Sequence, residues 1–454
     1  MRRRHPLAAV VAFGLLVVAA VLFVPFAGAT ATAANAHGTL ISVGPPNGVN
    51  DTASIQAALD SCVGKGPNCV VQLSPGTYRT TQLVTYNFEG TFRGAGQATT
   101  TIEALPELSV VQNPTECLPN TTTCLWPTLI MFVDGHIRVS DLGIRITAED
   151  GTATTGWNIF GTQTTSLIDA LRFMGQNPTD ATVDRVSIQG KVDESANSFG
   201  VLFGFPASFN VVNGIIYTGE LPDSSSPSGM DFLRGSLTVH NSSFSTMIDG
   251  VSQDGQVTSS HITVGGAPKA GNQFDNLLVG IDLESSQNST FDISHNDVSG
   301  LYYGMWVVPW IPDIFTPNAL SHYQIHDNTF VTTEPGGTGI FLDNETANWI
   351  DANIWSNTVD LQQPGSEGIG DYGASHAQIL NNSITSSGGA FDAIGLYLGT
   401  THSTVAYNHL VGFGDAQQGS IYLGPQTSKN IVLCSHKSDT VTDQGTNNTT
   451  IACK

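Results

Sequence analysis

The sequence has few charged residues and, among these, few positive ones. Charged side chains make up 12% of the 454 residues, and 16 Lys and Arg stand against 38 Asp and Glu, for a formal net charge of -22. A chain this acidic is repelled by nucleic-acid phosphates and by anionic lipids, so we expect neither as a partner. Hydrophobic residues make up 40%, with 48 Gly and 21 Pro, which is typical of a turn-rich folded protein.

Long hydrophobic runs are absent after residue 36, so we expect no stable membrane insertion of the remainder. Before that point, Arg2 to Arg4 precede an apolar run from Leu7 to Ala29, and Ala34 and Ala36 offer a small-residue cleavage site. The pattern predicts a signal peptide over residues 1–36 and a secreted domain over residues 37–454. Because the apolar run is longer than that of most signal peptides, an uncleaved membrane anchor is the alternative. Cleavage would change the net charge from -22 to -25.

Cysteine is also scarce, and the six that occur fall into three local pairs. In an oxidising compartment an even number indicates disulfides, and nearness in sequence favours one pairing out of the 15 that six cysteines allow. No Cys-x2-Cys motif or histidine cluster accompanies them, so we expect no metal ligands here. The predicted disulfides are Cys62–Cys69, Cys117–Cys124 and Cys434–Cys453.

What the sequence does contain is an asparagine in a recurring setting. Stretches such as HYQIHDNTF (322–330) and TVAYNHL (404–410) place an apolar residue three positions before a central Asn and another two positions after it. Successive copies are 32, 29, 25 and 26 residues apart. A unit this short, with only β-like segments, cannot bury its own apolar face, so neighbouring units must stack. The central residues are Asn296, Asn328, Asn357, Asn382 and Asn408.

Stacking would align these Asn side chains in a ladder, each amide hydrogen-bonded to the copies above and below. Asn also tolerates the left-handed backbone conformation that a sharp corner needs, so a structural role explains the series better than catalysis. Less regular corners are expected at Leu142, Val186, Ser242 and Ser260, where long gaps indicate large loops or a hidden coil. Alternating segments follow about twelve residues further on and read GIDL (280–283), GMWV (304–307), GIFL (339–342), AIGLYL (393–398) and SIYL (420–423).

The segment NDTASIQAALDSC before the coils predicts a short amphipathic helix that covers the open end of the stack. Asp51 or Thr52 would cap it. Its apolar side would be formed by Ile55, Ala58, Leu59 and Cys62.

With this helix, the following VVQLSPGTY and FRGAGQATTTI segments and the Asn-bearing coils, the sequence resembles the right-handed parallel β-helix proteins of the pectin-lyase-like group over roughly residues 40–434. The resemblance implies an all-β fold, a single-stranded right-handed parallel β-helix (solenoid) with a short N-terminal capping α-helix. It does not select an activity, because the group contains polygalacturonases, lyases, epimerases, tailspikes and adhesins. The Asn-Thr-Asp, Asp-Asp, Gly-His-Gly and Arg-x-Lys motifs of the polygalacturonases are absent.

In enzymes of that group the active cleft lies along one exposed strand face. If that face is formed by the Gly-Ile-x-Leu strands, Ile281 and Leu283 point inward, and Asp282 and Glu284 point outward with Cα atoms about 6.5 to 7 Å apart. Carboxyl groups roughly 5 to 9.5 Å apart suit glycosidic hydrolysis. The predicted catalytic residues are Asp282, Glu284 and, from the preceding coil, Asp249. This hypothesis requires Asp282 to be open to a groove, and solubilising or Ca2+-binding roles are the alternatives.

Aromatic side chains accompany these carboxylates. Trp306 and Phe341 with Asp343 would follow on the same face in the next coils, and Trp310 lies in the adjoining loop VVPWIPDIF. Aromatic rings beside carboxylates suit a sugar, whose C–H face packs on the ring while its hydroxyls bind the carboxylates. Trp306, Trp310, Phe341 and Asp343 are therefore the predicted substrate-binding residues, with packing of the loop as the alternative.

The sequence thus predicts a secreted, monomeric protein that hydrolyses an extracellular polysaccharide without a required cofactor. A noncatalytic glycan-binding or adhesion protein is the second hypothesis, since the same long face would serve it. A Ca2+-dependent polysaccharide lyase is the third, and it is weakened because the middle coils offer only Arg234 and Lys269 as bases.

Overall fold

The computed structural model describes residues 38–105, 128–146, 156–157, 163–164, 169–190, 199–204, 207–219, 228–232, 235–253, 257–284, 286–308, 320–343 and 350–453. The predicted signal segment, the Cys117–Cys124 pair and Trp310 lie outside these residues. Within them, no helix has the length and apolar character needed to cross a membrane.

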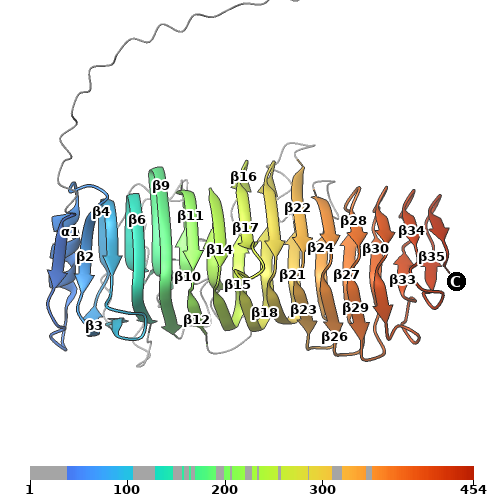
Figure 1. The fold of residues 1–454 in the computed structure, drawn as a ribbon, viewed down its shortest axis with the longest axis horizontal. Coiled ribbons are helices and arrows are strands. Elements are labelled where there is room, and N and C mark those ends of the chain that lie inside the picture. The colour runs from blue at the N-terminus through green and yellow to red at the C-terminus, as the bar shows by residue number, and fades with distance from the viewer. Residues whose placement is uncertain are drawn as a thin grey trace, which may run out of the picture. The chain divides into compact units, whose positions relative to one another are not determined.

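The described chain is a right-handed parallel β-helix, as predicted. One coil consists of β22 (Ser321–His326), β23 (Thr329–Thr332) and β24 (Thr338–Asp343), and the next consists of β25 (Ile350–Trp355), β26 (Thr358–Leu361) and β27 (Glu367–Tyr372). Each strand pairs in parallel with its counterpart one coil away. Thirty-two strands are joined in this way, and Figure 1 shows the coils side by side from α1 to β35.

The stack has three strand faces. Face 1 contains the second halves of β18 (Gln273–Glu284) and β21 (Asp297–Val308), then β24, β27, β30 (Asp392–Tyr397) and β33 (Ile421–Leu423). Face 2 contains β17 (His261–Gly265), β20 (Thr290–Ser294), β22, β25, β28 (Gln378–Leu380) and β31 (Thr404–Ala406). Face 3 contains the first halves of β18 and β21, then β23, β26, β29 (Ser383–Ser386) and β32 (His409–Val411).

The interior is filled by aligned apolar side chains, and one inward row consists of glycines. A Cβ atom on Gly250 would lie 2.2 Å from Cδ1 of Phe274, and one on Gly280 would lie 2.2 Å from Cγ1 of Val298. Since heavy atoms cannot approach this closely, only glycine lets the start of face 1 pack on the aromatic and branched side chains of face 3. The phenyl rings of Phe244 and Phe274 stack with centroids 5.4 Å apart across two coils.

The predicted asparagine ladder is present at the corner between face 2 and face 3. The side-chain amide of Asn328 donates to Oδ1 of Asn357 at 3.0 Å, and the amide of Asn357 donates to Oδ1 of Asn382 at 3.0 Å. Each amide also donates to a main-chain carbonyl, such as that of Ile325. The buried amides are thus fully partnered, and the ladder closes the corner from Asn296 to Asn408.

Three details of the predicted corners were wrong. The left-handed residue is the one before each ladder Asn, for example Asp327 with φ 55° and Ser356 with φ 57°, because it makes the bend and leaves the Asn free to face inward. Ser260 belongs to a different corner, between face 1 and face 2, where its main-chain N–H donates a hydrogen bond to Oγ of Ser289. The ladder continues instead through Asn272, whose amide donates to Asn296 Oδ1 at 2.9 Å.

The hidden coil is also present. β11 (Ala207–Asn213), β12 (Ile216–Thr218) and β13 (Ser228–Phe232) form a coil whose corner is Gly214–Ile215, with φ 66° at Gly214. No coil is hidden between the predicted corners Leu142 and Val186. These two residues are direct register partners, so they belong to neighbouring coils despite the long gap between them.

The helix α1 (Thr52–Cys62) has the predicted buried side, formed by Ile55, Ala58, Leu59 and Cys62. It packs on β1 (Leu40–Val43), β2 (Cys69–Leu73) and β4 (Leu83–Arg93), which are the first strands of the stack. Asp51 precedes the helix without a side-chain cap, because its carboxylate accepts hydrogen bonds from the main-chain amides of Asn47 and Arg79. The predicted disulfides Cys62–Cys69 and Cys434–Cys453 are both formed.

Candidate functional site

Face 1 brings several of the predicted site residues into one row. Asp282 is the register partner of Trp306, and Trp306 is the partner of Phe341. The flanking residues Ile281 and Leu283 are fully buried, so the strand alternation places this row on the outer side of face 1. Asp343 lies two residues beyond Phe341 and is the register partner of Tyr372.

The three predicted catalytic carboxylates do not lie in one row. Asp282 and Glu284 lie on face 1, whereas Asp249 lies on β15 (Ser243–Gln253) of the preceding coil. Asp249 is the partner of Val279, whereas Ser252 is the residue that pairs with Asp282. Asp249 is 8% exposed and Asp282 is 7% exposed, while Glu284 at the end of β18 is half-buried. Asp282 is therefore nearly closed to solvent, which limits its contact with a substrate on this face.

The aromatic side chains of face 1 form a continuous row. Tyr303 packs against both Trp306 and Phe341, with ring centroids 5.3 Å apart in each case. Beyond Phe341 the contacts continue through tyrosines of the next three coils. The successive centroid distances are 4.8 Å for Phe341–Tyr372, 4.3 Å for Tyr372–Tyr397 and 5.2 Å for Tyr397–Tyr422. We call Tyr303, Trp306, Phe341, Tyr372, Tyr397 and Tyr422 the aromatic row.

Two carboxyl groups that the sequence analysis missed lie beside the aromatic row. Glu367 and Asp392 are register partners at the starts of β27 and β30, so their Cα atoms are one strand spacing, about 4.8 Å, apart. Glu367 is 5% exposed and Asp392 is fully buried. Oε1 of Glu367 and Oδ1 of Asp392 accept no hydrogen bond from any residue in the described ranges.

The pKa values of both groups are raised. Burial is the main cause for Glu367, with the charge of Asp392 adding to it and the hydroxyls of Tyr397 and Thr338 partly offsetting it. Burial also raises the pKa of Asp392 to about 7, against a hydrogen bond from Tyr397 that lowers it. Two acids this close in a dry site cannot both ionise easily, so the pair holds a proton at neutral pH.

Tyr397 and two glycines shape the surroundings of this pair. The Tyr397 hydroxyl donates to Oδ2 of Asp392 at 2.5 Å. A Cβ on Gly370 would lie 2.6 Å from Oε2 of Glu367, and one on Gly395 would lie 2.1 Å from Cε2 of Tyr397. The glycines therefore leave the space in which the carboxyl group of Glu367 and the ring of Tyr397 lie. The hydrogen bond from Tyr397 thus stabilises the ionised form of Asp392, against the effect of burial.

A third acidic group lies on the inner side of the same strands. Asp371 is the register partner of Leu342 and Leu396 and is fully buried. Burial raises its pKa to about 7, although its carboxylate accepts hydrogen bonds from the Ala374 amide at 2.8 Å and the Thr400 hydroxyl at 3.3 Å. Because Asp371 faces the interior, we assign it to the structure of the coil and not to the outer face.

Positive charge is missing from this part of the chain. The sequence contains no Lys or Arg between Lys269 and Lys429, a stretch that includes face 1 from β18 to β33. A carboxylate-bearing polymer would meet only like charge there. The site is suited to an uncharged ligand.

A signal for the missed pair does exist in the sequence. Glu367 to Tyr372 reads EGIGDY, and Asp392 to Tyr397 reads DAIGLY, so both coils share the order acid, x, Ile, Gly, x, Tyr. The segment EGIGDY is absent from the alternating segments chosen by the Gly-Ile-x-Leu pattern, because Asp371 replaces the expected leucine. Aligning coils by register would have revealed it.

No protein-family model matches the sequence, and no curated protein matches it. Among solved structures, the chain is similar to PfbA, a surface adhesin of Streptococcus pneumoniae, with a TM-score of 0.52 and 15% identity over 82% of this chain and 92% of that one. It is also similar to DFA-IIIase from Arthrobacter chlorophenolicus A6 (TM-score 0.46, 12% identity, 88% and 95% covered). A third is a family 28 exopolygalacturonase from Yersinia enterocolitica (TM-score 0.44, 12% identity, 90% and 78% covered).

The similarity to PfbA confirms the predicted resemblance at the level of the fold. The chain has the parallel β-helix architecture of pectin-lyase-like proteins. At 15% identity or less, this likeness shows the fold alone and does not indicate an activity.

Proposed function

We propose that this protein is a secreted carbohydrate-active enzyme that hydrolyses glycosidic bonds of an uncharged extracellular polysaccharide on face 1. The observation that carries the proposal is the Glu367–Asp392 pair, with its raised pKa values, beside the aromatic row. Paired acids with perturbed pKa values cluster at functional sites.

Hydrolysis of a glycosidic bond needs one acid and one base or nucleophile. In the proposed reaction Glu367 donates its proton to the glycosidic oxygen as the bond to the anomeric carbon breaks. Asp392 either takes a proton from the attacking water, or attacks the anomeric carbon itself to form a glycosyl ester that water then hydrolyses. Sugar rings pack on the aromatic row, and Asp249, Asp282, Glu284 and Asp343 bind hydroxyl groups. Glu367 and Asp392 replace Asp249, Asp282 and Glu284 as the first choice for the chemistry because their pKa values are raised.

For the glycosidic oxygen to reach Glu367, the ring of Tyr397 has to rotate away from Asp392. Tyr397 is half-buried at the end of β30 and stacks on Tyr372 and Tyr422. A sugar ring entering the row would replace part of this stacking. The proposal therefore includes a side-chain rotation during binding.

The test is an incubation of the purified protein with plant, algal and microbial polysaccharides, with Ca2+ and with chelator, measuring reducing ends and the absorbance of unsaturated sugars. We expect reducing ends without unsaturated products on a neutral polymer. Glu367→Gln and Asp392→Asn are each expected to reduce the rate at least about 100-fold, which is the usual contribution of a general acid or base. The matched control is Asp360→Asn, which removes a carboxylate from face 3 of the same coil and should leave the rate within about twofold.

Three other outcomes would contradict the proposal. Unsaturated products that require Ca2+ would indicate the lyase. Loss of activity in Asp282→Asn or Glu284→Gln, with Glu367→Gln unaffected, would move the chemistry to those carboxylates. Binding without any product would indicate a noncatalytic protein.

That noncatalytic glycan-binding protein is the second candidate. The observation in its favour is the burial of the acids, since Asp392 is fully buried and Glu367 is 5% exposed. In this case the aromatic row and the outer carboxylates bind the glycan, and the pair only organises the tyrosines.

A further inference from the structure

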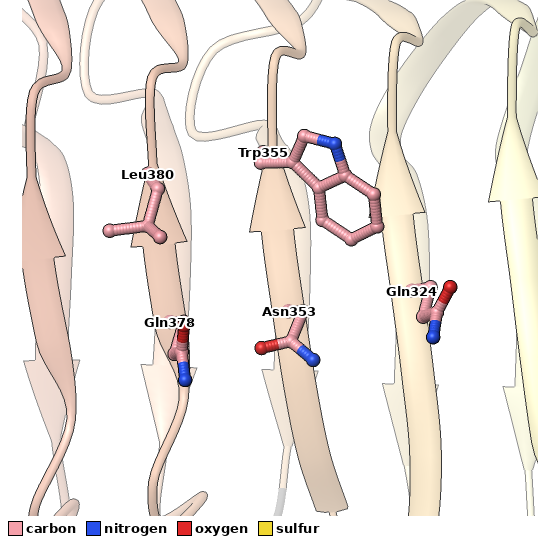
Figure 2. A pocket seen from close by; sticks show the side chains of 5 residues that line it. All are labelled: Gln324, Asn353, Trp355, Gln378 and Leu380. Atoms are coloured by element: carbon pink, nitrogen blue, oxygen red, sulfur yellow. The ribbon is translucent and has the colours of Figure 1, made fainter.

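Face 2 carries a second arrangement of side chains suited to a ligand. Gln324, Asn353 and Gln378 are register partners on β22, β25 and β28. Figure 2 shows these amides one per strand along the stack, with Trp355 and Leu380 beside them. The five residues line a shallow depression of about 350 Å³. We call Gln324, Asn353, Gln378, Trp355 and Leu380 the face-2 strip.

The three amides have no hydrogen-bond partner in the described part of the chain, although they are spaced like the ladder amides. Gln324 and Gln378 are exposed and Asn353 is half-buried. In the ladder, by contrast, the amide of Asn328 donates to both Asn357 and a main-chain carbonyl. Each amide of the strip thus keeps two N–H donors and a carbonyl acceptor available for a ligand, one set per coil.

Trp355 and Leu380 form an apolar edge of the strip, and contacts with neighbouring side chains fix the position of the Trp355 ring. The indole of Trp355 stacks on the imidazole of His326 with centroids 4.2 Å apart and an interplanar angle of 11°, and the next residue in that row is Leu380. His326 is itself fixed by Asp327, whose Oδ2 lies 2.8 Å from Nδ1. An ordered aromatic surface next to polar groups matches a sugar, which has an apolar C–H face and a rim of hydroxyls.

Charge excludes an anionic ligand. Carboxylates lie next to the strip, one in the row of the three amides and one two residues before it on the middle strand. Asp292 is the register partner of Gln324, and Asp351 lies at the start of β25 with Oδ2 2.8 Å from Nδ1 of His322. Face 2 from β20 to β31 also falls within the stretch without Lys or Arg. A neutral polymer pays no electrostatic penalty here, whereas a polyuronate does.

We propose that the face-2 strip is a binding site for a neutral polysaccharide, separate from face 1. The polymer lies along the helix axis, its hydroxyls hydrogen-bond to Gln324, Asn353 and Gln378 in successive coils, and one sugar packs on Trp355. The proposal takes its ligand class from the proposed function but does not require catalysis. The site would keep the protein on its substrate while face 1 acts.

The test is affinity electrophoresis in native gels that contain a soluble β-glucan, a galactomannan, a fructan or polygalacturonate. We expect at least one neutral polymer to retard the wild-type protein. The triple variant Gln324→Ala/Asn353→Ala/Gln378→Ala and the variant Trp355→Ala should each raise the Kd at least about tenfold, since several net hydrogen bonds or one stacking contact are lost. Matched controls are Gln417→Ala, which removes an exposed amide outside the strands, and Tyr407→Ala, which removes an aromatic side chain that is 62% exposed.

Unchanged retardation of both strip variants, absence of retardation by every neutral polymer, or retardation by polygalacturonate alone would each overturn the proposal. Failure here is distinguishable from failure of the proposed function. If only the enzyme assignment is wrong, the wild-type protein releases no reducing ends, yet the strip variants still lose retardation. If only the strip is wrong, Glu367→Gln abolishes hydrolysis, and the strip variants bind like the wild-type protein.

Discussion

Polar groups are buried in two regions of the same coils, at the asparagine corner and at the Glu367–Asp392 pair. Asn328, Asn357 and Asn382 have 1 to 2% exposure, and each amide is hydrogen-bonded to its neighbours and to the main chain. Glu367 and Asp392 are buried to a similar degree, yet Oε1 of one and Oδ1 of the other accept no hydrogen bond from the described residues.

This difference in hydrogen bonding indicates a structural role for the asparagine corner and a functional role for the Glu367–Asp392 pair. A buried amide with all its partners stabilises a fold, because the cost of desolvation is offset. A buried acid pair with unmet oxygens destabilises it, and such sites are retained where their chemistry is used. Substitutions should therefore have opposite effects on stability in the two regions.

The largest expected effect is at the corner. Asn357→Ala removes the acceptor of Asn328 and the donor to Asn382, leaving buried groups without partners. We expect the free energy of unfolding to fall by about 3 kcal/mol, measured by denaturant unfolding. The matched control is Asn353→Ala, an outward amide four residues earlier, which should change it by less than about 0.5 kcal/mol. Equal losses in the two variants would remove the distinction between ladder and surface amides.

A smaller effect, of opposite sign, is expected at the acid pair. Glu367 has a raised pKa in the folded state, so its contribution to stability is fully present below its unfolded pKa and is lost as the pH rises through the folded pKa. Gln does not titrate, so the free energy of unfolding of Glu367→Gln should rise relative to that of the wild-type protein between pH 5 and pH 8. Thermal unfolding of the variant and the wild-type protein at pH 5 and at pH 8 measures this difference in stability. Some pH dependence should persist, because Asp371 also has a raised pKa. A variant whose stability falls between pH 5 and pH 8 as steeply as that of the wild-type protein would contradict the assignment.

The smallest effect is expected for the ion pairs of the N-terminal coils. The guanidinium of Arg185 contacts Asp141 at 2.7 Å and is half-exposed, so solvent screens the interaction. Arg185→Ala should lower the free energy of unfolding by less than about 1 kcal/mol, and the difference should shrink in 1 M salt. A loss comparable to that of Asn357→Ala would show that these coils depend on charge rather than on a ladder.

The fold could be predicted because stacking imposes a repeat on the sequence. Asn328 and Asn357 must keep the same place between apolar neighbours, and this leaves a visible pattern. Asn272 was missed because residues 266–271 are inserted between β17 and the corner, which breaks the spacing. The hidden coil was expected only as one of two alternatives, and its corner at Gly214–Ile215 was not located because it carries no polar side chain.

The candidate site was predicted only in part. Alternation was enough to place Trp306 and Phe341 beside Asp282 on one face. The pairing of Glu367 with Asp392 depends on the register between coils of different length, which single-sequence reasoning does not supply. The raised pKa values follow from burial beside the aromatic row, and burial is a property of the assembled stack.

The run without basic residues, from Lys269 to Lys429, also determines how the chain can be cut. A protease that cleaves after Lys or Arg has no site between these residues in the folded or the unfolded state. Complete digestion would leave residues 270–429 as one peptide, carrying Glu367, Asp392 and the whole face-2 strip. Opening of these coils is therefore invisible to such a protease, whereas one that cleaves after aromatic residues meets the exposed Tyr302 and Tyr407. Comparing the two digests would locate the coils that open first.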